Sequence, residues 1–284
     1  MRFIDTHVHF WNQALMPYDW LHEVAAIAHA HTPKTLAAEA GENHPARIVF
    51  VECGAPWLDE VKWIEQLAAT EPRIVGIVAK TVVDAGAPTT AAIAELKTHS
   101  LVRSVRHMIQ GQADPDFCLR PAFVAGVREL GNAGLSFDLC CKHHQMASVV
   151  ELVRRCPETR FILDHAGKPD IRGGLLDPWR ARIRSLAALP NVDCKLSGLI
   201  TEADWAAWTT ADLHPYVLHL LETFGPGRLL FGGDWPVAKL AGSYLRWLDT
   251  ARGLVSHLST AEQSAIFHDN ARRVYRFARP PVPP

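Results

Sequence analysis

Short apolar runs and longer amphipathic runs alternate along the whole chain. The apolar runs are rich in β-branched residues and are followed by polar loops, which is typical of buried parallel strands. They predict strands at residues 3–9, 48–53, 74–82, 102–108, 135–142, 161–165, 192–196 and 229–234.

The segments between these strands carry apolar residues at helical spacing. They predict helices at 58–70, 89–98, 121–132, 146–156, 178–189, 215–224 and 244–258, with a last helix at 261–277. The first crossover is the least regular. We expect 31–40 to supply its helix, after a long loop that contains Trp11 and Trp20.

Eight strands that alternate with helices predict a parallel sheet covered by helices. In a chain of 284 residues, eight such units favour a closed (β/α)8 TIM-like barrel over an open sheet. A GxGxxG motif does not follow the first strand, which disfavours a dinucleotide-binding fold. Composition does not shift along the chain, so we expect one domain at 1–279 and a flexible Pro-rich tail at 280–284.

Charge and cysteine usage narrow the class of partner. The chain has 29 basic and 30 acidic residues and a net charge of -1, which gives no general attraction to nucleic acid or to an anionic membrane. It has neither a signal-peptide pattern at the start nor an apolar stretch of about 18 residues. The six cysteines form no CxxC pair and are expected to be buried thiols in a reducing compartment. We therefore expect a cytoplasmic protein with a small-molecule substrate, either a monomer or a homodimer.

The chemistry of such a barrel lies at the carboxyl ends of its strands. Most of the predicted strands finish in titratable side chains, which apolar packing alone does not explain. These are His7, His9, Glu52, Arg106, His107, Lys142, His143, His144, His165, Lys195 and Asp234.

His7 and His9 are two residues apart on a strand, so both side chains project to the same face, as does Asp5. Two imidazoles on one face can share a divalent ion, and His165 and Asp234 from distant strands can complete its coordination. The alternative is that both histidines are core residues hydrogen-bonded to Asp5. Strand alternation predicts that Asp164, next to His165, points to the opposite face.

Asp234 lies in FGGDWP, where its carboxylate can ligate a metal or accept a proton from an attacking water; the alternative is a turn cap. The cationic and imidazole candidates Arg106, His107, Lys142 and His144 can stabilise a developing oxyanion, or they are solvated or salt-bridged. The same alternative holds for Arg103 and Lys195. Two aromatic side chains beside the motifs, Trp11 and Trp235, either stack on a substrate ring or anchor loops.

Five motifs in order, DTHVHFW, VRH, LDHAGKP, CKLSGL and FGGDWP, resemble the amidohydrolase superfamily of the amidohydrolase 2 type. Within it the chain is similar to the L-fuconolactonase-like branch of sugar-lactone and pyrone-dicarboxylate lactone hydrolases. The resemblance implies a distorted barrel that hydrolyses lactones, with Asp234 as general base and His9 and His165 as further catalytic residues. Glu52 stands where relatives often have glutamine and is expected to bind substrate.

The resemblance also bears on the metal. Binuclear relatives commonly use a bridging lysine or glutamate after the fourth strand, where this chain has Arg106 and His107. Lys142 could bridge only if the strand assignment is wrong by one. We expect at most one divalent ion, zinc, held by His7, His9, His165 and Asp234, or a metal-independent enzyme in which the histidines bind substrate.

The predicted reaction is attack of water on the carbonyl of a sugar-acid lactone, such as a fuconolactone or rhamnonolactone. One alternative is a metal-dependent decarboxylase or another amidohydrolase acting on a small carboxylated ring. Another is an inactive barrel that serves as a scaffold, which the intact set of titratable strand ends disfavours. The adjacent Cys140 and Cys141 have no predicted role beyond burial.

Overall fold

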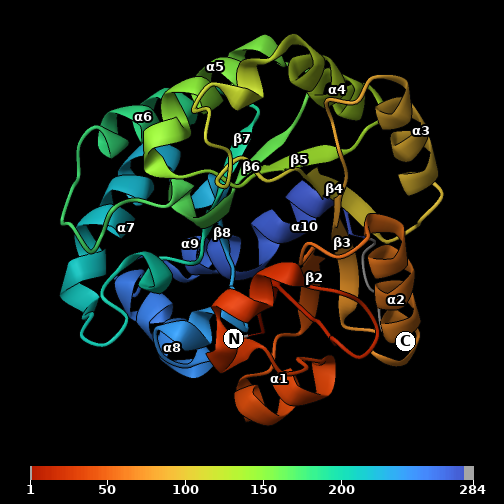
Figure 1. The fold of residues 1–284 in the computed structure, drawn as a ribbon. Coiled ribbons are helices and arrows are strands. Elements are labelled where there is room, and N and C mark those ends of the chain that lie inside the picture. The colour runs from red at the N-terminus through yellow and green to blue at the C-terminus, as the bar shows by residue number, and fades with distance from the viewer. Residues whose placement is uncertain (1, 278–284) are drawn as a thin grey trace.

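The computed structural model describes residues 2–277, in which eight parallel strands form one sheet in sequential order (Figure 1). The strands are β1 (Ile4–Val8), β2 (Arg47–Val51), β3 (Ile74–Lys80), β4 (Val102–Arg106), β5 (Ser136–Leu139), β6 (Phe161–Leu163), β7 (Val192–Leu196) and β8 (Leu229–Phe231). The Pro-rich tail predicted at 280–284 lies outside the described residues. The predicted (β/α)8 barrel is confirmed.

The first and last strands meet at their carboxyl ends. The backbone N–H of Asp234 donates to the His7 carbonyl at 2.8 Å, and that of His9 donates to the Trp235 carbonyl at 2.7 Å. Lower down, the Thr6 hydroxyl donates to the carbonyl of Phe231 at 2.7 Å. These bonds close the barrel where the chemistry is expected, so the ends of β1 and β8 share one rigid edge.

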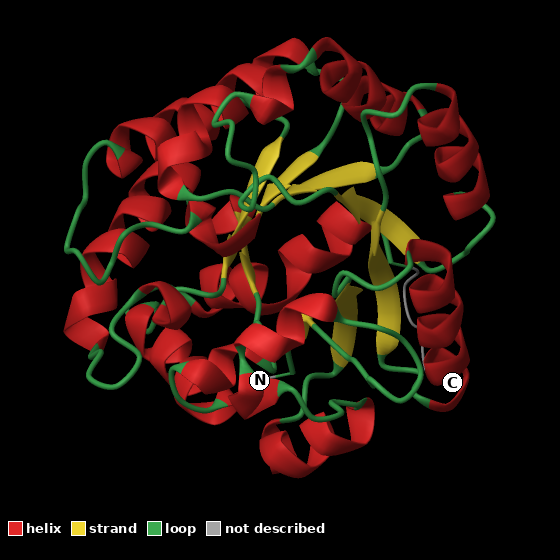
Figure 2. Ribbon diagram, in the orientation of Figure 1, coloured by secondary structure: helices red, strands yellow, loops and turns green. Residues whose placement is uncertain are grey.

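Helices surround the strands on the outside (Figure 2). The outer helices are α1 (Pro33–Ala40), α2 (Trp57–Thr70), α3 (Ala87–Leu96), α4 (Pro121–Asn132), α5 (Met146–Arg155), α6 (Trp179–Ala187), α7 (Thr210–Phe224), α8 (Tyr244–Leu254) and α9 (Thr260–Ser264), and α10 (Asn270–Tyr275) follows them at the end of the barrel. None of the helices within 2–277 is long and apolar enough to cross a membrane.

Two helix predictions were wrong in their bounds. The helix predicted at 215–224 begins earlier, because the N–H and hydroxyl of Thr209 both donate to Asp212 and cap it there, and Pro215 is accommodated inside it. The helix predicted at 261–277 is divided by a π-helical turn at Ala265–Asp269. This turn separates α9 from α10 and lets the chain enter the barrel.

The helix α10 lies inside the ring of strands and closes its amino-terminal end (Figure 1). Val274, Tyr275 and Phe277 pack there against an apolar layer of strand residues that includes Ile4 and Leu230. The carboxyl half of the barrel interior is different, because polar and charged side chains fill it. This apolar layer thus lies directly beneath a buried polar site.

Candidate active site

Four side chains from three strand ends meet at the closed edge of the barrel. Asp234 Oδ1 lies 3.5 Å from His9 Nε2 and 3.8 Å from His7 Nε2, and its Oδ2 lies 4.0 Å from His165 Nδ1. All four residues are at most 6% exposed. The four predicted metal or catalytic residues therefore form one cluster, with the carboxylate among three imidazoles.

His7 and His9 of β1 face Asp234 inside the barrel, whereas Asp5, which follows the inward-facing Ile4, points outward to Tyr244 of α8, so the prediction that Asp5 shares their face was wrong. Asp5 accepts hydrogen bonds from the backbone N–H groups of His7 and Gly233 and from the Tyr244 hydroxyl. Asp5 thus ties β1 to the loop after β8, and no hydrogen bond from it to either imidazole is found in the described part of the chain. His7 and His9 are therefore not core residues bound to Asp5, and they are available to bind a metal ion or a substrate.

His9 is held in one tautomer by the neighbouring strand. Its Nδ1 lies 2.8 Å from the carbonyl oxygen of Val51, which can only accept, so Nδ1 carries the hydrogen. The other ring nitrogen, Nε2, faces Asp234. This is the arrangement of a metal-ligating histidine whose second nitrogen is fixed by a backbone carbonyl.

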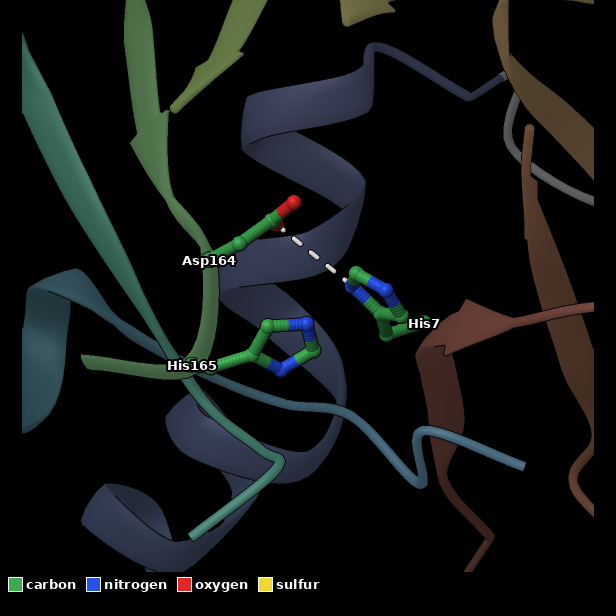
Figure 3. Close-up of side chains that lie close together, drawn as sticks. All are labelled: His7, Asp164 and His165. Atoms are coloured by element: carbon green, nitrogen blue, oxygen red, sulfur yellow. Dashed lines mark ion pairs between the residues drawn. The ribbon is translucent and has the colours of Figure 1, made fainter. Parts of the chain in front are cut away.

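The chain leaves β6 in a left-handed conformation, with φ of 51° at both His165 and Ala166. This abrupt turn abolishes strand alternation, so Asp164 and His165 both point toward His7 (Figure 3). The prediction that Asp164 faces away from the site was therefore wrong. His165 is held in place by the Ser197 hydroxyl, 3.0 Å from its Nδ1.

Beneath the histidines lies a buried network of charges. Lys195 Nζ lies 2.6 Å from Asp138 Oδ2, 2.8 Å from Asp164 Oδ1 and 3.2 Å from His7 Nδ1. Arg106 lies beside it, with Nε 2.7 Å from Glu52 Oε1 and Nη1 3.3 Å from Asp164 Oδ2. Each cation has two carboxylate partners, as buried charges require.

Burial and neighbouring charges set the protonation states. Loss of hydration lowers the pKa of His7 and of His165 well below the ordinary value, so both rings are neutral. Burial alone would raise the pKa of Asp234, but the facing imidazoles, His165 first, bring it below its ordinary value. Burial alone would lower the pKa of Lys195. The carboxylates of Asp138 and Asp164 outweigh the effect of burial and raise the pKa of Lys195 well above its ordinary value. The site thus holds an ionised carboxylate beside the neutral rings of His7 and His165.

Not every predicted substrate-binding residue reaches the cluster. Trp11 and Trp235 are fully buried, and their indole N–H groups donate to His29 and to Glu39, respectively. They anchor loops, and their ring faces are covered by protein. His107 packs between Phe117 and Phe123, with the Val83 N–H 3.3 Å from its Nδ1, on the outer side of the strand.

Lys142 and His144 are exposed at the rim, because β5 ends at Leu139 and not at the predicted 142. The bridging position considered for Lys142 is therefore not available to it. Glu52 and Arg106 do lie at the carboxyl end of the barrel, but they are paired with each other. Arg106 Nη2 also donates to the Glu52 carbonyl at 2.7 Å, which ties β4 to β2.

Sequence reasoning missed Asp138 and Lys168, and it named Lys195 only as a strand-end charge that is solvated or salt-bridged. Asp138 and Lys195 each lie among apolar residues of a short strand, in SFDL and VDCKL, and a charge in such a position is a signal of a buried partner. Lys168, in the LDHAGKP motif, is half-buried at the mouth with Nζ 2.9 Å from Glu202. Burial alone would lower the pKa of Lys168, but the nearby Cys140, Glu202 and Asp234 raise it above its ordinary value.

The donor set fits a divalent ion. Ligand atoms of His7, His9 and Asp234 lie within 4.8 Å of one another, and a second group of His7, Asp164 and His165 shares His7. His7 Nε2 is a buried nitrogen without a hydrogen-bond partner among residues 2–277. Imidazole nitrogens with one carboxylate are a donor set that zinc accepts.

The fold and this cluster match known proteins. The family model of the amidohydrolases matches residues 4–277, and the chain belongs to that family. An L-fucono-1,5-lactonase of Burkholderia multivorans is 36% identical over 98% of this chain and 97% of its own length. A second L-fucono-1,5-lactonase, of Burkholderia ambifaria, is 32% identical over 98% of this chain and 96% of its own length.

Among solved structures, an amidohydrolase of Burkholderia multivorans crystallised with bound zinc superimposes with a TM-score of 0.88. It is 32% identical, and the match covers 98% of this chain and all of that one. The family expectation from the motifs is therefore confirmed, and the chain is an enzyme of the amidohydrolase type.

Proposed function

We propose that this enzyme opens the ester bond of a sugar-acid lactone, of the fuconolactone or rhamnonolactone type. The observation that carries the proposal is the Asp234 carboxylate, ionised and surrounded by His7, His9 and His165 at the closed edge of the barrel. The similarity to L-fucono-1,5-lactonases over nearly the whole chain supports the substrate class.

In the proposed reaction Asp234 accepts a proton from the attacking water and returns it to the ring oxygen as the ester bond breaks. The lowered pKa of Asp234 keeps it ionised as a base at neutral pH. The developing oxyanion lies among the imidazoles. A hydrogen bond from a ring N–H stabilises the oxyanion more strongly there than it would in water. His165, fixed by Ser197, keeps the carboxylate oriented toward the water.

We propose that the site can hold one divalent ion, zinc, through His7, His9 and Asp234, with His165 completing its coordination. A bound ion would act as a Lewis acid on the lactone carbonyl. We also propose that Lys168 and the rim residues Lys142 and His144 bind the hydroxyl groups of the substrate. The six cysteines are all free, which supports the expected reducing, cytoplasmic compartment.

The test is ring opening of a panel of aldonolactones, followed as proton release, with and without a chelator. We expect turnover that falls by about 10²–10⁴-fold in Asp234→Asn, the contribution typical of a general base. The control is Asp249→Asn, which removes an exposed aspartate of α8. Absence of turnover on every lactone, together with tightly bound zinc in the purified protein, would overturn the proposal and favour a decarboxylase.

A further inference from the structure

A group of arginines lies at the amino-terminal end of the barrel, opposite the candidate active site. Arg103 belongs to β4, Arg160 precedes β6, Arg273 belongs to α10 and Arg276 follows it. The buried Asp193, near the start of β7, pairs with two of them. Arg160 Nη1 lies 3.2 Å from Asp193 Oδ2, and Arg273 Nη2 lies 2.6 Å from Asp193 Oδ1. One carboxylate thus serves two guanidinium groups.

The other two arginines have no carboxylate partner among residues 2–277. Arg276 Nη2 donates to the carbonyl of Gly134 at 2.7 Å, and Arg103 Nη1 donates to the carbonyl of Val102 at 3.3 Å. Burial lowers the pKa of Arg276, and the neighbouring Arg160 lowers it further. The pKa of Arg103 is lowered by burial and then by Arg276. These cations therefore lie close enough to repel one another, and nothing in the described part of the chain neutralises them all.

A cavity of about 390 Å³ opens between the loops that precede β5, β6 and β7, and Arg160 and Arg276 line it. This volume lies within the range of small-molecule sites, about 300–1,000 Å³. Glu158 is the carboxylate among the lining residues; it is exposed and forms no ion pair with either arginine. A cleft lined mainly by one sign of charge focuses the field and concentrates ions of the opposite sign. The cavity therefore favours an anion.

The free side-chain donors of this cavity belong to the two guanidinium groups. Asn191 Nδ2 already donates to three backbone carbonyls of the loop before β6, and the Thr159 hydroxyl donates to the Val127 carbonyl at 2.9 Å. A guanidinium has five N–H groups. Within residues 2–277, Arg160 bonds only through Nη1 and Arg276 only through Nη2. The remaining donors form forks that match the oxygens of a phosphate group.

We propose that this cavity is a second ligand site, in which Arg160 and Arg276 bind a phosphate group. The source of the group is inorganic phosphate or a small phosphorylated metabolite. A phosphate dianion suits the site better than a single carboxylate, because four arginines here share one buried carboxylate. The bound group joins the end of α10 to the loop before β6. The site lies at the opposite end of the barrel from Asp234, so the proposal is independent of the lactone reaction.

The first test is binding of inorganic phosphate to the wild-type protein, measured by calorimetric titration and by Tm. We expect saturable binding, and a Tm that rises with phosphate above its value in sodium chloride of equal ionic strength. The reason is that a ligand of the folded state stabilises that state. A Tm that is the same in both salts, without saturable binding, would overturn the proposal.

Glucose 6-phosphate is the second probe, because it carries the same group as a monoester. Tighter binding of this ester than of inorganic phosphate supports the proposal with a phosphorylated metabolite as the ligand. Binding of inorganic phosphate alone supports it with the free ion as the ligand. Binding of neither probe refutes it.

Substitutions assign the binding to this cavity. In Arg276→Gln and in Arg160→Gln we expect the Kd for phosphate to rise at least about tenfold, because each variant loses charge-assisted donors. Arg276→Lys keeps the charge but loses the fork, so its Kd should rise less. The control Arg182→Gln removes an exposed arginine of α6 outside the cavity. An unchanged Kd in both glutamine variants, or an equal rise in Arg182→Gln, would contradict the assignment.

Two separate positions keep the test decisive if one variant fails to fold. Arg160→Gln also removes a partner of Asp193, whereas Arg276→Gln breaks no ion pair within residues 2–277. The fold of each variant is checked by its Tm in sodium chloride. A variant that retains the wild-type Tm in chloride should lose the additional rise in phosphate.

Discussion

Asp164 and His165 are neighbours in the sequence, and both side chains point to the same side, into the barrel (Figure 3). In a strand they would face opposite ways. The positive φ of His165 ends the strand geometry at Leu163 and brings the two together. As a result one short segment supplies both an imidazole beside Asp234 and the carboxylate that contacts Lys195, Arg106 and His7.

Replacing Asp164 with asparagine should destabilise the protein and impair the enzyme. Lys195 and Arg106 would each lose one of their carboxylate partners, and leaving a buried charge short of a partner costs on the order of 3–5 kcal/mol. The measurement is the free energy of unfolding in urea, with lactone turnover in the same preparation.

Asp138→Asn is the matched comparison for that variant. Asp138 also pairs with Lys195, but the network places it further from the imidazole cluster, and its other partners are the hydroxyls of Ser104 and Tyr275. We expect a similar loss of stability and a smaller loss of turnover per folded molecule. Equal loss of turnover in both variants would show that Asp164 has no role beyond pairing with Lys195.

A methyl group at Gly198 should displace His165. A Cβ there would lie 2.3 Å from His165 Nδ1, and Gly198 has a φ of +61°. We expect Gly198→Ala to lower turnover strongly, since His165 must move away from Ser197 and Asp234. Gly225→Ala is the control, because Gly225 has a φ of +68° and no atom within 4 Å of such a Cβ. It should cost about 1–2 kcal/mol of stability from the left-handed backbone alone and leave turnover unchanged.

Glu60 should make the stability of the protein depend on pH. Burial on α2 raises its pKa to about 8 from an ordinary 4.5, with the nearby Glu52 adding to the shift. Because the folded value is the higher one, the stabilising contribution is fully present below about pH 4.5 and is lost as the pH rises through about 8. We expect Glu60→Gln to gain on the order of 3 kcal/mol over wild type between pH 5.5 and pH 8.5. Urea unfolding of both proteins at these two values is the check, and parallel pH profiles would refute it.

Trp11 should matter for stability and not for substrate binding. Its indole N–H donates to the carbonyls of Ile27 and His29, and the ring is fully buried. Trp11→Phe should lower the free energy of unfolding by about 1–3 kcal/mol, the cost of buried carbonyls left without a donor, with KM for the lactone unchanged. A raised KM at unchanged stability would restore the earlier expectation that this ring stacks on the substrate.

Local patterns in the amino-acid sequence were enough to predict the order of the elements and the residues of the central part of the site. Strand and helix periodicities are local properties of the backbone, so the eight alternating units and the common face of His7 and His9 could be predicted without knowing any contact. Because the carboxyl ends of all strands lie at one end of a barrel, His165 and Asp234 could then be predicted to lie near His7 and His9. These rules predicted which residues form the cluster, and not the distances between them.

The partners of the charged side chains, in contrast, depend on long-range packing. The direction of His165 depends on a left-handed turn that local propensity disfavours in a histidine, and the surrounding fold imposes it. The three contacts of Lys195 join β7 to β5, β6 and β1, and only closure of the barrel brings those strands together. The burial of Trp11 likewise depends on the loop that covers it. Such contacts link residues far apart in the sequence, and their distances are set by packing, which no local periodicity encodes.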